Sequence, residues 1–181
     1  MFNSYREEFF DLSGDEKRMF MEVAYKLGFC YNDLGRYKEA YYYLDLMAND
    51  GNIRHTMEMV NNMANNKDLR VFNYTDGVME EVKRNFENQE EVPEHIRQFI
   101  SFLRRRRGYA LIDFGKLDDA EKIFTSMLDD LENAPYASQE LGYIKHLRSL
   151  RERYEASLAK IAEKDQKAQK AEKGTDTEGL Q

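Results

Sequence analysis

The sequence predicts an all-α fold, and three observations support this prediction. Leu, Met, Glu, Lys and Ala recur at helical spacing, whereas strand-like alternation of β-branched residues is essentially absent. Proline occurs only at Pro93 and Pro135, which both fall between or at the start of helical segments. One pattern of small and large residues also occurs twice, which is typical of stacked helical hairpins.

Residues 1–51 predict a short helix and then a helical hairpin. The short helix, in residues 1–12, should pack on the hairpin through aromatic residues on one side, namely Phe2, Tyr5, Phe9 and Phe10. Ser13 and Glu16 have the spacing of a capping box, which predicts a helix from residue 13 to about residue 34. Gly35 should end it, and a return helix should follow with the apolar stripe Tyr37, Ala40, Tyr41, Leu44 and Met47.

The middle of the chain predicts a second, less regular hairpin. One helix should carry Ile53, Met57, Val60 and Met63, and another should carry Val78, Val82 and Phe86. The glycine and alanine of the first hairpin have no counterparts here and asparagines are frequent, so an irregular loop is the alternative. Relative to a regular repeat, about 12 extra residues precede the third hairpin.

The last part of the chain predicts a third hairpin and one long helix. Pro93 suits the first turn of a helix that should reach Phe114, and a return helix with Leu117, Ala120 and Phe124 should follow. The long helix, residues 135–163, has an apolar stripe and should cap the stack; the stripe is Leu141, Ile144, Leu147, Leu150, Tyr154, Leu158 and Ile161. Residues 164–181 are polar and are expected to be disordered.

The repeated pattern has a glycine, a turn glycine seven residues later, an alanine five residues further on and then a large apolar residue. In order, these residues are Gly28, Gly35, Ala40 and Leu44 in the first copy and Gly108, Gly115, Ala120 and Phe124 in the second. Small residues let two helices approach closely, and large ones fill the seam between them. The two copies therefore predict two hairpins of the same geometry.

This pattern resembles the tetratricopeptide repeat (TPR). The matching positions are Leu27, Gly28, Tyr31, Gly35, Tyr37, Ala40 and Leu44, then Gly108, Leu111, Gly115, Leu117, Ala120 and Phe124. Arg104 and Arg107 stand where the family prefers an aromatic residue and a leucine, and Asn52 and Glu132 replace its closing proline. The resemblance spans roughly residues 20–132. It implies a right-handed superhelix of three hairpins, with residues 13–134 as the repeat domain.

The resemblance also implies a concave groove, lined by the first helix of each hairpin, that receives a peptide or a partner helix. On this mapping the groove residues are Tyr25, Phe29, Asn32, Phe102, Arg105, Tyr109 and Ile112. Aromatic rings with an arginine are typical anchors for a bound peptide. The alternative is that these rings pack within the protein and fill the groove themselves.

Three consecutive tyrosines cannot all be buried by one helix. Tyr41 fits the core, whereas Tyr42, Tyr43 and Leu46 should lie on the convex side. We expect them to be covered by the helix in residues 1–12 or to contact a second copy of the chain.

Composition narrows the classes of function. A net charge of −7 disfavours nonspecific nucleic-acid binding. We therefore expect the arginines of the run Arg104–Arg107 to pair within the protein or to be solvated; binding of a partner carboxylate is the second alternative and binding of a nucleic acid the third. No apolar run approaches a membrane span and the N-terminus has no secretory pattern, so a cytoplasmic location is expected. The single cysteine, Cys30, is expected to be buried.

No pattern predicts chemistry. His55, His95 and His146 lack metal-ligand spacing, and no nucleophile or phosphate-loop motif is present, so we expect no catalytic residue, cofactor or metal. The sequence therefore predicts a non-enzymatic adaptor that binds a protein or peptide partner, without nucleic acid or membrane. The alternative is a structural module with a self-filled groove that homodimerises or docks onto a larger complex.

Overall fold

The described part of the chain is all-helical. The computed structural model describes residues 11–48, 50–87 and 89–175, and within these residues it has helices and no strand. The helices are α2 (Gly14–Asp33), α3 (Tyr37–Leu44), α4 (Ile53–Asn65), α5 (Arg70–Phe86), α6 (Glu94–Asp113), α7 (Leu117–Thr125) and α8 (Ala134–Thr175), with a 3₁₀ turn, η1 (Asp45–Met47), after α3. The all-α prediction is confirmed for these residues. Residues 1–10, on which most of the predicted first helix falls, lie outside the described part.

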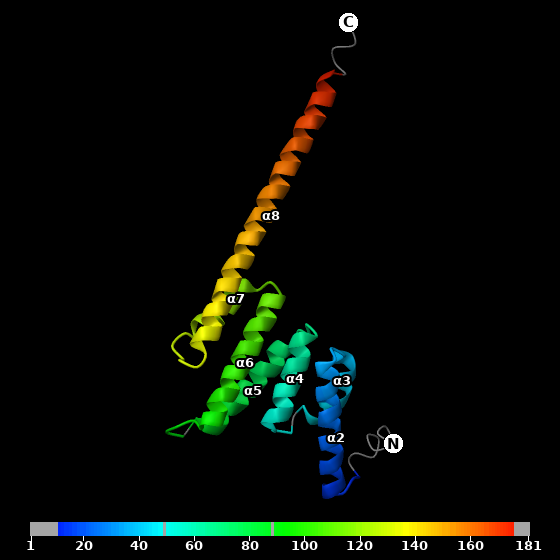
Figure 1. Ribbon diagram of the computed structural model, residues 1–181, viewed down its shortest axis with the longest axis vertical. Coiled ribbons are helices and arrows are strands. Elements are labelled where there is room, and N and C mark those ends of the chain that lie inside the picture. Colours follow the sequence, from blue (N-terminus) through cyan, green and yellow to red (C-terminus); the bar gives the residue numbers. More distant parts are fainter. Residues whose placement is uncertain (1–10, 49, 88, 176–181) are drawn as a thin grey trace. The chain divides into compact units, whose positions relative to one another are not determined.

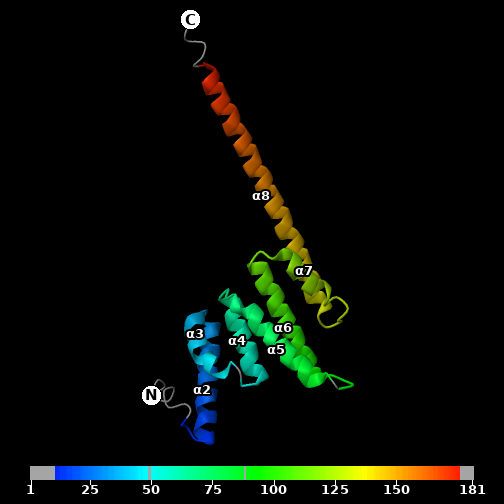
Figure 2. The ribbon, with the colours of Figure 1, turned by 180° about the vertical axis from the view of Figure 1, so that it is seen from behind.

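The chain divides into two compact units, residues 1–127 and 128–181. In the first unit, consecutive helices pair as α2 with α3, α4 with α5, and α6 with α7. The first helices of the three pairs, α2, α4 and α6, lie side by side in chain order (Figures 1 and 2). The core of this unit runs through the first two hairpins and α6; its largest fully buried members are Leu44, Met47, Met59 and Leu103.

The three hairpins turn in the same way. In the first, the backbone N–H groups of Gly35 and Arg36 donate to the carbonyls of Asn32 and Tyr31, which is the Schellman arrangement that ends a helix at a left-handed residue. Gly115 and Lys116 repeat these bonds after α6, and Lys67 and Asp68 repeat them after α4. Gly35 and Gly115 both have φ of 70°, and Lys67 has φ of 53°. The middle hairpin is therefore regular, although a lysine stands where the other two have glycine.

The helical glycines are sites of close helix approach, as the sequence predicts. A Cβ atom at Gly28 would lie 2.6 Å from the Leu44 side chain, and one at Gly108 would lie 2.5 Å from the Phe124 ring. Leu44 and Phe124 are both fully buried. α2 and α6 are thus each held against the return helix at a distance that only glycine permits.

Other boundaries agree with the sequence or differ by a few residues. The capping box between Ser13 and Glu16 is present. Pro93 lies at the N-cap of α6, one residue before the predicted first turn. α5 has 17 residues, against 8 in α3 and 9 in α7, and this extra length absorbs part of the predicted insertion. Cys30 is exposed, contrary to expectation, because it lies two residues past Gly28 and so on the far side of α2.

The second unit is dominated by one long helix. α8 has 42 residues and runs to Thr175, past the predicted end at residue 163 (Figure 1). Its last part is rich in Ala, Lys, Glu and Gln, which all favour helix, and no glycine occurs there before Gly174. Disorder was predicted from residue 164 because the residues that follow are polar. Polarity alone does not prevent a helix whose residues have high helix propensity.

Two glycines test the close approach of the helices. We expect Gly108→Ala to lower the free energy of unfolding by about 1–3 kcal/mol, because the added methyl group overlaps the buried Phe124 ring. Gly77, in α5, has open space around it, so Gly77→Ala should raise stability by about 0.5–1 kcal/mol through helix propensity. Urea unfolding of the two variants measures both effects; equal shifts for the two would contradict the steric explanation.

The turn at Lys67 should improve when glycine replaces lysine. A left-handed conformation costs a non-glycine residue about 1 kcal/mol, so Lys67→Gly should stabilise the protein by up to about this amount. The ion pair between Lys67 and Asp113, at 3.9 Å and largely exposed, contributes little that would be lost. The reverse change, Gly35→Lys, should lower stability by a similar amount in the same urea titration. A loss of stability in Lys67→Gly would show that the left-handed conformation of Lys67 does not lower the stability of this hairpin.

Candidate functional site

A band of aromatic and charged side chains crosses α2, α4 and α6, and its α2 end is built around Tyr25. The Tyr25 ring lies 6.4 Å from the Phe29 ring and 5.1 Å from the His55 ring, between ring centroids. The guanidinium carbon of Arg54 lies 4.8 Å above the centre of the Tyr25 ring. Phe29, with 47% of its surface exposed, is the open member of this group. The predicted pair Tyr25 and Phe29 therefore does lie together, beside a cation from α4.

The α6 end of the band contains Phe102 and Arg106. The guanidinium carbon of Arg106 lies 5.7 Å from the centre of the Phe102 ring. Burial lowers the pKa of Arg106, while the nearby Tyr109 and Glu58 act in the opposite direction. Among the described residues no carboxylate lies within ion-pair distance of Arg106. Arg106 is thus a half-buried cation with unused hydrogen-bonding capacity.

We call these residues, Tyr25, Phe29, Arg54, Phe102 and Arg106, the first-helix surface. Arg54 and Arg106 were not among the residues expected from the sequence. Arg106 is adjacent to the expected Arg105, and about 100° of helix rotation separates the two side chains. Arg105 and Ile112 are half-buried. Tyr109 packs on the Phe124 ring of α7, at 5.8 Å between centroids, so part of this ring serves the hairpin interior.

Asn32, which was expected to line the groove, lies instead in a buried polar network. Its Nδ2 atom donates to the Glu58 carboxylate at 2.6 Å, and its Oδ1 atom accepts from Asn62 Nδ2 at 2.7 Å. Asn62 Nδ2 also donates to the Tyr37 carbonyl at 2.7 Å. The network connects α2, α3 and α4. Its hydrogen bonds use the side-chain amide of Asn32, which would otherwise be the group that contacts a partner in the groove. Asn32 therefore joins the first two hairpins.

His55 fixes the start of α4 against the preceding connector. Its Nδ1 atom lies 2.6 Å from the Asp50 carboxylate, and the side chain is almost wholly buried. Asn52 caps the helix by accepting from the Arg54 backbone N–H at 3.0 Å. These contacts hold Arg54 in place over Tyr25.

The arginine run 104–107 divides between two roles. Arg107 Nη1 lies 2.8 Å from the Asp76 carboxylate, and the same side chain donates to the Phe72 carbonyl and the Thr75 hydroxyl. Internal pairing, one of the predicted outcomes, therefore applies to Arg107, which binds α6 to α5. Arg106 is rotated about 100° around the helix from Arg107, lies over the Phe102 ring and belongs to the first-helix surface.

The tyrosines that were predicted to lie on a convex side form a ring cluster. Tyr43 stacks on Tyr31 at 5.4 Å between centroids, and Tyr42 meets Tyr43 edge-on at 5.3 Å. Arg36 lies over the Tyr31 ring. Tyr42 keeps 38% of its surface exposed, and Leu46 is half-buried against the core. The predicted cover by Phe9 and Phe10 falls on residues outside the described part.

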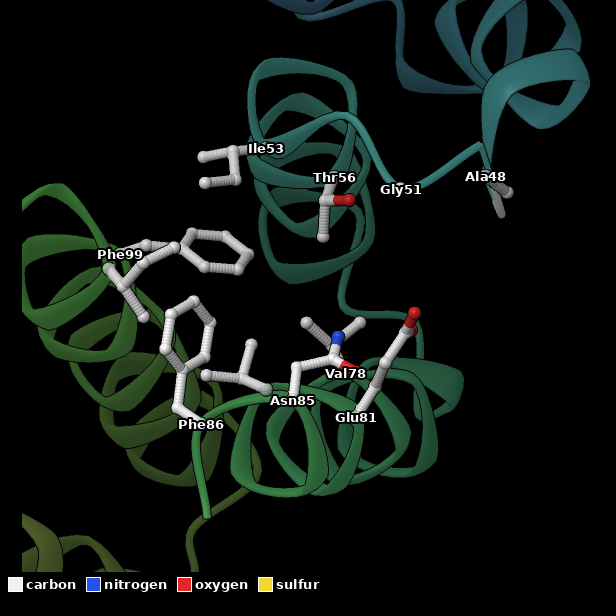
Figure 3. Close-up of a pocket in the computed structure, with 11 residues that line it drawn as sticks. Ala48, Gly51, Ile53, Thr56, Val78, Glu81, Asn85, Phe86 and Phe99 are labelled. Atoms are coloured by element: carbon white, nitrogen blue, oxygen red, sulfur yellow. The ribbon is translucent and has the colours of Figure 1, made fainter. Parts of the chain in front are cut away.

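A cavity of about 190 Å³ lies among α4, α5, α6 and the connector before α4 (Figure 3). Its apolar walls include Ile53, Val78, Val82, Phe86 and Phe99, and polar groups supply about as much of the lining. Glu81, Asn85 and Thr56 supply the polar part of the lining. The volume suits one apolar side chain and is too small for most cofactors. Sequence reasoning could not predict this cavity, because its walls come from three separate helices.

The described residues contain neither a cluster of metal-binding side chains nor a helix that could span a membrane. Among the described residues, no group of three or more His, Cys, Asp or Glu side chains is placed to hold a metal ion. No helix in that part of the chain has the length and apolarity needed to span a membrane. A scan against family models, a search of curated proteins and a search of solved structures each give no match.

The buried network at Asn62 should contribute measurably to stability. Asn62 is 1% exposed, and Asn62→Ala removes the donor from both the Asn32 amide oxygen and the Tyr37 carbonyl. Buried acceptors without partners cost about 1–3 kcal/mol, so we expect a loss of that size in urea unfolding. Asn65→Ala, at an exposed position of the same helix, should change stability by less than about 0.5 kcal/mol. Similar losses for both variants would show that the network is not what holds the hairpins together.

Proposed function

We propose that this chain is a non-enzymatic adaptor of the tetratricopeptide type, which binds a peptide or a helix of a partner protein on the first-helix surface. The observation that supports this most directly is the threefold repetition of one turn, at Gly35, Lys67 and Gly115, in a stack whose first helices lie side by side. Proteins built from stacked hairpins use such aligned helices as an extended binding surface.

The side chains of this surface have the chemistry of a protein-binding site. Tyr, Phe and Arg are among the residues that contribute most to protein interfaces. Phe29 is half exposed although it is large and apolar, and Tyr25 beside it is already fixed by Arg54 and His55. Rings held in place before binding lose little conformational entropy when a partner arrives.

Arg106 supports a preference for acidic partners. Burial has already removed part of its hydration, and its planar guanidinium is suited to a carboxylate in two-point contact. A partner segment would place an apolar side chain near Tyr25 and Phe29 and an acidic group near Arg106. In this proposal Arg106 takes the place of Arg105, the arginine that was expected from the sequence to line the groove.

Affinity capture with defined variants tests the proposal. The full chain would be used as bait in lysate of its source cell, followed by mass spectrometry, with the wild type compared with Phe29→Glu and Arg106→Gln. We expect partner recovery to fall by about tenfold or more in each variant, because each change removes a central anchor. Circular dichroism of the baits establishes that both variants are folded.

Val23→Glu is the matched control. Val23 is exposed on the same helix but lies about 200° around it from Tyr25, so the added charge is far from the first-helix surface. Its partner recovery should equal that of the wild type. A partner set that Phe29→Glu and Arg106→Gln leave unchanged would contradict binding at this surface.

A further inference from the structure

The outer part of α8 has an apolar face that the described residues leave open. Every side chain in residues 151–167 is exposed, including Tyr154 at 65% and also Leu158 and Ile161. Together with residues nearer the start of the helix they form one stripe, Tyr143, Leu147, Leu150, Tyr154, Leu158 and Ile161. An apolar stripe on a helix usually packs against another element, so the spacing of the stripe residues indicates which kind of surface fits it.

The spacing of the stripe is symmetric about Tyr154. Leu150 and Leu158 lie four residues on either side, Leu147 and Ile161 lie seven, and Tyr143 and Asp165 lie eleven. If a second α8 runs antiparallel about a two-fold axis at Tyr154, each position meets its counterpart at the same level. Leu150 then meets the partner copy's Leu158, and Leu147 meets its Ile161. The end positions bring a tyrosine hydroxyl to a carboxylate, since Tyr143 is level with Asp165.

The stripe also follows the helix without drifting around it. Tyr143 and Tyr154, Leu147 and Leu158, and Leu150 and Ile161 are each eleven residues apart. A period of eleven corresponds to about 3.67 residues per turn, close to the natural value for an α-helix. Two such helices can therefore stay in contact over the whole stripe with little supercoiling.

Charges beside the stripe favour the antiparallel direction. Arg151 and Glu155 lie on one flank, about 60° and about 100° around the helix from Tyr154. They form an ion pair within one helix, at 3.0 Å between Nε and Oε1. In the antiparallel pair, Arg151 of one copy lies within about 3 Å, along the axis, of Glu155 of the other, which joins two pairs into a network of four charges.

A parallel pair would give no net gain from these charges, because the partner copy's Arg153 would lie as close along the axis to Glu155 as to Arg151. Such a pair would bring the flank with Arg151 against the opposite flank of the partner copy, where Arg153 lies at nearly the same level. In the antiparallel pair the two Arg153 side chains face the same flank, but each turns back along its own helix toward Ser149, to whose carbonyl oxygen Nε donates at 3.2 Å. Only the antiparallel pair therefore brings the flank with Arg151 and Glu155 against its own copy, where Glu155 is the charged residue nearest to each Arg151.

We propose that residues 143–165 of α8 bind the same segment of a second copy of this chain, antiparallel, about a two-fold axis at Tyr154. This interface is separate from the first-helix surface, so a dimer presents two copies of that surface. The occupant is a second copy because the stripe and the Arg151–Glu155 flank complement themselves.

Sedimentation of the full chain over a range of about 1–200 µM, which covers the affinity expected of a small interface, tests self-association. The wild type should show reversible dimer formation, and Tyr154→Glu should weaken it by at least about tenfold by placing two carboxylates at the axis. Ala156→Glu adds the same charge on the opposite face of the same helix and should leave the dimer unchanged. Full-length wild type that stays monomeric over this range, or a dimer that survives Tyr154→Glu, would overturn the proposal.

Cysteine pairing tests direction and register. In a Cys30→Ser background, the full-length variants Leu150→Cys and Leu158→Cys carry tags of different mass and are oxidised alone and mixed. The antiparallel register predicts the mixed disulfide, because residues 150 and 158 share a level whereas two copies of residue 150 lie about 12 Å apart along the axis. Disulfides between identical variants, formed in preference to the mixed product, would show a parallel pair and overturn the proposal.

Discussion

The first unit depends on the contact between a helical glycine and a large side chain of the return helix. At Gly28 and Leu44, and again at Gly108 and Phe124, the paired helices approach so closely that a single added carbon would overlap the neighbour. The close approach brings the start of α3 near α4, where Asn62 donates to the Tyr37 carbonyl. Tyr25 and Phe29 share one face of α2 because they are four residues apart, and the contact at Gly28 fixes the rotation of that face relative to α3. The binding surface that we propose is thus a consequence of how the hairpins close.

The middle hairpin achieves the same closure by other means. Val60 stands seven residues before its turn, where the other hairpins have glycine, and it is fully buried. Lys67 adopts the left-handed conformation that glycine provides elsewhere. Arg107 adds a connection from α6, since it binds the Phe72 carbonyl, the Thr75 hydroxyl and the Asp76 carboxylate. Arg107 therefore connects the second and third hairpins.

The sequence predicted the elements well where local chemistry determines them. The capping box at Ser13, the turns at Gly35 and Gly115 and the two glycine contacts all follow from residues close together in the chain. The regular turn at Lys67 was beyond sequence reasoning, because nothing in a lysine indicates positive φ. The site was less predictable, since neighbouring positions such as Arg105 and Arg106 differ only by helix rotation. The role of Asn32 depends on Glu58 and Asn62, 26 and 30 residues further along the chain.

The unequal length of the return helices restricts where a further hairpin could be inserted in this stack. A repeat array grows by duplication when every hairpin offers the next one the same surface. Here α5 is about twice as long as α3 and α7, and its additional turns supply Val82, Asn85 and Phe86 to the cavity wall. A copy of the first hairpin inserted after α5 would meet a surface shaped for α6 alone. The hairpins therefore share a design, but the first cannot replace the second or third at the junction between α5 and α6.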